Sequence, residues 1–264
     1  MIGLIARPYP TAVAGGFGWS ASFPASNLTN NDYGRVAATG VLGAGASVQV
    51  VLDLGSAKTI DTLAALWHNG ANGDTFQIAA SNNADMSAKI YNSAALSARQ
   101  GQTMRDVLPL WKSVYTIPPV TARYWAITFT TSASKPAGFQ MSRMFVGKGS
   151  QFVIGPQKAT LGAKDMNANI TTEVGEQRSQ EDQNLIRPAI SLSFEYAKQS
   201  EIEEVLGQYT LALGVSKPML VCTDLTSVYT QDNVAFGRPE KVVTVESSVY
   251  DVWSFEAVVT SLGI

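Results

Sequence analysis

Few residues in this chain could do acid–base, nucleophilic or metal chemistry. Its 264 residues include one histidine, His68, and one cysteine, Cys222. A disulfide within the chain and a zinc site with three or four Cys/His ligands are therefore excluded. A histidine-based triad could use only His68, which follows Trp67 at the end of an apolar run. Because no acid–nucleophile pattern surrounds it, we expect a strand-end histidine that is hydrogen-bonded to the backbone.

Carboxylates are the remaining catalytic option. A glycosidase needs two facing Asp/Glu side chains with different pKa values, and we recognise no such pair. Glu201, Glu203 and Glu204 fall in the first turn of an expected helix. The helix dipole favours acidic residues at that place, so we interpret them as a solvated face. The sequence therefore predicts no enzyme and no cofactor.

The sequence gives little indication of binding to ions, nucleic acid or membranes. Asn30, Asn31 and Asp32 could hold Ca²⁺ through oxygen ligands, but an Asx turn explains the same residues and is the interpretation we prefer. The net charge of −2 gives no long-range attraction to a phosphate backbone. The sequence has no run of 18 apolar residues, so we expect no membrane insertion.

Short apolar runs bounded by turn signals dominate the first half of the chain. Such runs are typical of an all-β sandwich. The expected strands are Val48–Gly55, Ile60–Leu66, Thr75–Ser81, Arg123–Thr130 and Phe139–Val146. A Gly-rich stretch at 147–151 then predicts a junction, which divides the chain into domains 1–148 and 149–264.

The second half predicts an α+β domain. Residues 173–184 are polar, and we interpret them as an exposed arm. A capping box at Ser200 predicts one helix over 201–214, which packs on an antiparallel sheet. The strands expected in that sheet are Ile190–Tyr196, Met219–Thr223, Lys241–Glu246 and Val252–Val259.

The first domain resembles the galactose-binding-like, or discoidin-type, jelly-roll sandwich. Five elements occur in the family's order after Asn27-Leu28: VQVVLDLG at 48–55, the run at 60–66, TFQIAASN at 75–82, RYWAITF at 123–129 and the closing strand at 139–147. Ser142-Arg143 departs from the acid usual in that closing strand. The resemblance implies a binding or docking module. Loop aromatics stack on sugars in its carbohydrate-binding members, which makes Trp19, Tyr33 and the pair Trp67-His68 the candidates for glycan contact.

The second domain is similar to the ring-forming domain of phage distal-tail and tail-tip proteins. The similarity lies in the order of the polar arm, the helix, the Pro-led strand at 217–221, the Gly-Arg strand at 234–238 and the aromatic strand at 253–259. The family usually places its ring domain first, whereas here the order is reversed. The resemblance implies a non-enzymatic virion protein, made in the host cytoplasm, that forms a hexameric or trimeric ring and contacts other tail proteins such as the tube and hub.

The low charge content suits a surface covered by neighbouring subunits. Charged residues make up 15% of the chain, against about 25% in average proteins, and Lys and Glu are depleted in interface cores. We expect the arm to fold over a neighbouring subunit through Glu176, Gln177, Arg178, Gln180 and Asp182. Two alternatives stay open, a carbohydrate-binding protein that recognises a host surface glycan and a polysaccharide hydrolase with an accessory sandwich.

Overall fold

The computed structural model describes residues 3–30, 35–102, 110–152, 158–165, 186–197, 203, 214, 217–240, 244–249 and 252–261. These residues form an almost entirely β structure, and the prediction of a mainly β fold is confirmed. The strands join in one antiparallel sheet with the order β10-β11-β15-β13-β12-β1-β9-β4-β8-β5-β6. No helix in this described part is long and apolar enough to cross a membrane.

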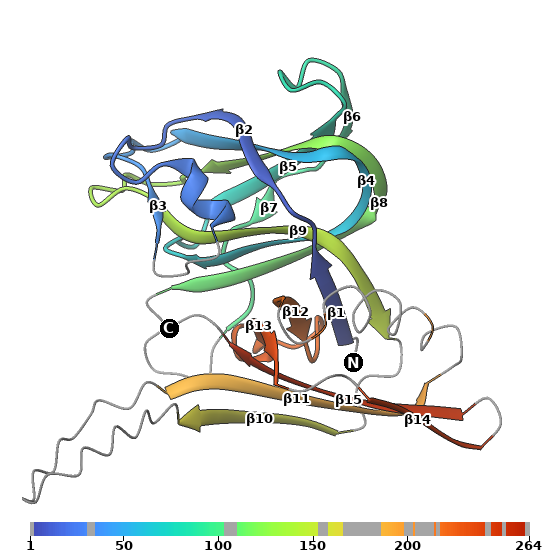
Figure 1. The fold of residues 1–264 in the computed structure, drawn as a ribbon. Helices are drawn as coiled ribbons and strands as arrows, with labels where there is room; N and C mark the ends of the chain where they lie inside the picture. Colours follow the sequence, from blue (N-terminus) through green and yellow to red (C-terminus); the bar gives the residue numbers. More distant parts are fainter. Residues whose placement is uncertain are drawn as a thin grey trace, which may run out of the picture.

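Two long bent strands build the N-terminal sandwich (Figure 1). β4 (Ser47–His68) and β8 (Trp111–Thr130) run antiparallel, and their register shifts between Asp53 and Lys58. The first half of β4 pairs with β2 (Ala12–Phe17), and its second half pairs with β9 (Gln140–Phe152). Each long strand therefore contributes to both layers.

The strands predicted at 48–55 and 60–66 are thus two arms of the single strand β4. Residues 55–59 between them are exposed, and Gly55 has a φ of 75°. Glycine adopts this left-handed conformation without a steric penalty, so the bend can form there. The core lies between the layers and includes the fully buried residues Trp125, Phe76, Phe129 and Phe139.

Shorter elements complete the sandwich. β5 (Thr75–Ser81) pairs with β8, with β6 (Lys89–Asn92) and with β7 (Leu96–Ser97). On the other layer, β3 (Ala37–Ala38) pairs with β9. The 3₁₀ helix η1 (Ala25–Thr29) lies in the connection between β2 and β3, and its buried Leu28 fastens it to the core.

The remaining strands form a second part below the sandwich in Figure 1. Its elements are β10 (Lys158–Asp165), β11 (Ile186–Ala197), β12 (Met219–Cys222), α3 (Thr230–Asn233), β13 (Val234–Pro239), β14 (Thr244–Val249) and β15 (Val252–Ser261). The short helix α3 was not predicted. The helix predicted over 201–214 lies outside the described residues except for Glu203 and Gly214, and the arm at 173–184 lies wholly outside them.

The N-terminal strand links the two parts. β1 (Gly3–Pro8) pairs with β9 of the sandwich on one side and with β12 of the second part on the other. A Cβ atom at Gly147 of β9 would collide with the carbonyl oxygen of Arg7, so glycine is required where these two strands meet. β9 continues to Phe152, and the boundary predicted at 148/149 therefore falls inside a strand.

A second hydrophobic core fills the space where the parts meet. It contains Leu4 from β1, Leu66 from β4, Phe145 from β9 and Phe236 from β13. Gln231 of α3 adds a polar link, because its side chain accepts from the Lys112 N–H (2.8 Å) and donates to the Lys112 carbonyl (2.7 Å) at the start of β8. The two parts are therefore joined by a shared core, by the pairing of β1 with β12 and by the side chain of Gln231.

Candidate functional site

The prediction that Trp67 and His68 contact a glycan is wrong. Only 6% of Trp67 and 0% of His68 is exposed. Trp67 packs into the second core, edge-on to Phe236 at 6.3 Å between ring centroids, and His68 packs edge-on against Phe76 at 5.4 Å. Both side chains lie at the end of β4, and this end of the strand is buried, so a ligand cannot reach them.

The hydrogen bonds of His68 fix its protonation. The Gly70 N–H donates to Nδ1 (3.0 Å), so that nitrogen carries no proton. Ser113 Oγ gives its proton to the Ala98 carbonyl (2.5 Å), so Nε2 of His68 must be the donor in its 3.0 Å contact with Ser113. Burial lowers the pKa of His68 to about 3, with nearby Lys135 as a second cause.

In this hydrogen bond the histidine donates to the serine, which is the reverse of the arrangement in a catalytic serine and its base. A serine activated by histidine donates its hydroxyl proton to the imidazole, whereas Ser113 accepts from His68. The pair is therefore a structural hydrogen-bond chain that closes the 68–70 turn against β8. The expectation of a backbone-bonded histidine at the strand end is confirmed.

Trp19 is only partly available to a ligand. Its indole N–H donates to the Gln49 carbonyl (2.8 Å), and its ring packs 6.2 Å from Phe139. The indole therefore lies along the rim of the core with part of its surface exposed. The other aromatic candidate, Tyr33, lies outside the described residues.

The candidate calcium loop is described only at its first residue. Asn30 is the C-cap of η1, and its carbonyl oxygen accepts a hydrogen bond from the guanidinium of Arg143. That oxygen already has a cationic partner from the protein, while Asn31 and Asp32 lie outside the described residues. Among the residues that the structure describes, no three His, Cys, Asp or Glu side chains are grouped to hold a metal.

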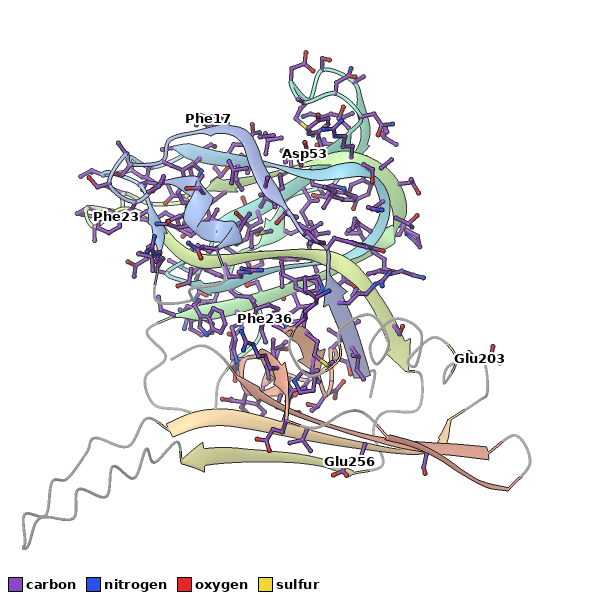
Figure 2. The ribbon with its side chains drawn as sticks, in the orientation of Figure 1. Phe17, Phe23, Asp53, Glu203, Phe236 and Glu256 are labelled. Atoms are coloured by element: carbon purple, nitrogen blue, oxygen red, sulfur yellow. The ribbon has the colours of Figure 1, made fainter. Side chains whose placement is uncertain are left out.

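A cavity beside η1 is the best candidate for a binding site. Its volume is about 410 Å³. The residues that line it come from the connection between β2 and β3: Ser22, Phe23, Pro24, Asn27, Arg35 and Val36. Phe23 is 49% exposed and lies at the loop end of the sandwich, well apart from the exposed Phe17 on β2 (Figure 2).

Backbone hydrogen bonds hold the walls of this cavity. The Ala38 N–H donates to the Phe23 carbonyl (3.1 Å), and the Ser20 N–H donates to the Ala38 carbonyl (2.8 Å). From η1, the Asn27 side-chain amide donates to the Val36 carbonyl (2.8 Å). These bonds tie both walls together through β3, so the backbone at Phe23 is held by the sheet.

The chemistry of the lining fits recognition of a ligand. Phe23 offers an aromatic face, Arg35 offers guanidinium donors, and Ser22 and Asn27 add a hydroxyl and an amide. Oδ1 of Asn27 accepts no hydrogen bond from any described residue. The described residues of the lining carry hydroxyl, amide and guanidinium groups beside the aromatic ring.

Sequence reasoning missed Phe23 and Arg35. They are 12 positions apart and form no motif, and Phe23 stands in a Ser-Phe-Pro segment that suggests only a loop. The one available signal was Pro24, which predicts an extended backbone at the preceding residue, Phe23. Their proximity follows from β3 and η1, which are too short to be recognised from a periodic pattern.

Comparisons with known proteins give similarity of structure only. No protein-family model matches the sequence, and no curated protein matches it. The family 32 carbohydrate-binding module of Clostridium perfringens NanJ, solved with galactose, is 17% identical, with a TM-score of 0.40 over 55% of this chain and 99% of that one. A chitosan-binding module from a Paenibacillus chitosanase/glucanase is 15% identical, with a TM-score of 0.38 over 54% of this chain and 98% of that one.

A further neighbour is the family 32 module of AlyQ, solved with 4,5-unsaturated mannuronic acid. It is 19% identical and has a TM-score of 0.36, and the match covers 54% of this chain and 96% of that one. In all three cases about half of this chain spans almost the whole neighbouring module. Membership of a phage distal-tail family stays a prediction.

Proposed function

We propose that the chain is a non-enzymatic recognition protein whose sandwich binds a glycan in the cavity at Phe23. The observation that carries the proposal is the half-exposed Phe23 ring in the wall of a cavity of about 410 Å³ that Ser22, Asn27 and Arg35 also line. Ligand pockets are lined mainly by apolar and aromatic side chains together with a few polar groups that fix the orientation of the ligand, and this lining has that composition.

The lining suits a sugar because a sugar ring is polar at its edge and apolar on its C–H face. The Phe23 ring can cover the apolar face, while Arg35, Asn27 and Ser22 can pair with hydroxyl groups. The hydrogen bonds to β3 fix the walls before a ligand arrives, which lowers the entropic cost of binding.

Glycan-array binding followed by calorimetric titration tests this function. Phe23→Ala should weaken the affinity at least about tenfold, a typical effect for an aromatic anchor at a binding site. Arg35→Gln should weaken it by a similar factor. Phe17→Ala is the matched control, because Phe17 is 52% exposed and lies outside the cavity lining. Equal losses from Phe17→Ala and Phe23→Ala would contradict the proposal, as would no loss from either.

A role as a ring-forming tail component is the second candidate. Among the described strands, β10 pairs only with β11 and so presents an edge at one end of the sheet. Edges of this kind can pair with a neighbouring copy. The mass of the purified protein in solution tests this role, since a ring requires six or three copies and a monomer contradicts it.

A further inference from the structure

The buried Arg143 lies between the proposed glycan site and the second part of the protein. It belongs to β9, opposite Leu66 of β4, and only 8% of it is exposed. Its guanidinium donates to the carbonyl oxygen of Asn30, the residue that ends η1. The same guanidinium lies 5.7 Å from the ring centroid of Phe236 in β13. One side chain therefore contacts elements from both parts.

Each of these contacts is directional. The last carbonyls of a helical turn lack partners within the helix and carry partial negative charge, so a guanidinium at that end both satisfies and attracts them. The ring of Phe236 offers its negative face to the cation. Phe236 itself is fully buried and held edge-on by Phe145 (5.9 Å) and Trp67 (6.3 Å), so it cannot follow the arginine if η1 moves.

We propose that Arg143 is a positioning residue that fixes η1 relative to Phe236 and so sets the shape of the cavity. η1 carries Asn27, whose amide joins the cavity walls, and Leu28, which fastens the turn to the core. A shift at Asn30 moves the turn that contains both residues. The importance of this shape for binding rests on the proposed function, whereas the mechanical link between Phe236, Arg143 and η1 does not.

The arginine cannot be replaced by an equivalent lysine. A guanidinium presents several donors in a plane and stacks on aromatic rings, whereas an ammonium is a compact, strongly hydrated charge. Arg143→Lys keeps the charge and should hold η1 only in part. Arg143→Met keeps the apolar stem and removes every donor, so it should release the C-terminal end of η1.

Amide hydrogen exchange on the full chain tests the link without a ligand. The amides of Asn27 and Asn30 report on η1, because they donate to the carbonyls of Pro24 (3.0 Å) and Asn27 (3.2 Å). Arg143→Met should speed exchange at both by at least about tenfold, as expected when a hydrogen bond to a charged group is lost. Amides in the middle of β8 should stay within about twofold of the original protein.

Two further variants complete the test. Phe236→Leu, which keeps apolar volume and removes the ring, should speed exchange in η1 by about threefold, the effect of losing a cation–π contact. Arg123→Met is the matched control, since Arg123 pairs with Asp53 on an exposed face of β8. Unchanged exchange at Asn27 and Asn30 in Arg143→Met would overturn the proposal. So would an equal rise at every amide, which would show only a loss of overall stability.

Glycan titration of the same variants separates the two proposals. If the original protein binds a glycan, Arg143→Met should weaken the affinity while Arg123→Met leaves it unchanged. If the original protein binds none, the proposed function fails, and the exchange rates still decide whether Arg143 links Phe236 to η1.

Discussion

Acid should destabilise this protein through its one histidine before the carboxylates begin to titrate. His68 is fully buried, and burial lowers its pKa to about 3 in the folded state, whereas an unfolded chain has a histidine pKa of about 6.5. Below pH 6.5 the imidazole of His68 is therefore protonated in the unfolded state and stays neutral in the folded state. The stability that depends on neutral His68 is complete above that pH and is lost as the pH falls towards 3.

The size of the effect follows from the distance between these pKa values. At pH 5 the solution is about 1.5 pH units below the unfolded pKa, and each unit corresponds to about 1.36 kcal/mol. The free energy of unfolding should thus fall by about 2 kcal/mol between pH 7.5 and pH 5. Urea unfolding at a series of pH values measures this loss directly.

The variant His68→Gln provides the comparison. Glutamine can donate and accept hydrogen bonds but has no group that titrates in this range, so its free energy of unfolding should change by less than about 0.5 kcal/mol over the same pH interval. Since His68 is the only histidine in the chain, the difference between the two proteins belongs to one side chain. Equal pH dependence in both, or an imidazole that titrates near pH 6.5 in the folded protein by NMR, would refute the reasoning.

Three more predictions concern buried groups. Asp74→Asn should lower the free energy of unfolding, measured in urea, by about 3 kcal/mol, because it leaves the largely buried ammonium of Lys135 (2.9 Å away) without its carboxylate. Adding Lys135→Met should recover most of that loss. A double variant whose loss is the sum of the two single losses would contradict this prediction. Gln231→Leu should lower the free energy of unfolding by about 2 kcal/mol, because the backbone N–H and carbonyl of Lys112 lose the Gln231 side chain as a partner. A decrease below about 0.5 kcal/mol would contradict a stabilising role for these two hydrogen bonds. Burial raises the pKa of Cys222 to about 12, so a thiol reagent should react with it only after unfolding, and rapid reaction in the native protein would show that the site is open.

The sequence predicted strands well where apolar residues alternate between turn signals. The run at Thr75–Ser81 has the same bounds as β5, and the closing aromatic run at 252–259 lies within β15. Alternation succeeds there because one face of each strand is buried. The alternation could not show that the runs at 48–55 and 60–66 are one bent strand. The residues between them look like a turn in the sequence, and nothing in their pattern indicates that they pair with a neighbouring strand.

Interactions between distant segments escaped prediction. The first residues, among which we predicted no strand, form β1 in the middle of the sheet. The pairing of β1 with β9 and β12 depends on residues more than 130 positions away. Trp67 and His68 misled the search for a glycan site, because an aromatic residue at a strand end has the same sequence pattern whether that end is exposed or buried.

Chemical-shift mapping during glycan titration tests the central claim most directly. A glycan selected on an array is added to ¹⁵N-labelled protein, and the backbone amides that move are located on the structure. We predict that the largest changes cluster at Ser22, Phe23, Asn27 and Val36 around the cavity. Changes centred on another surface, such as the exposed Val228 and Tyr229, or no change with any glycan, would contradict it.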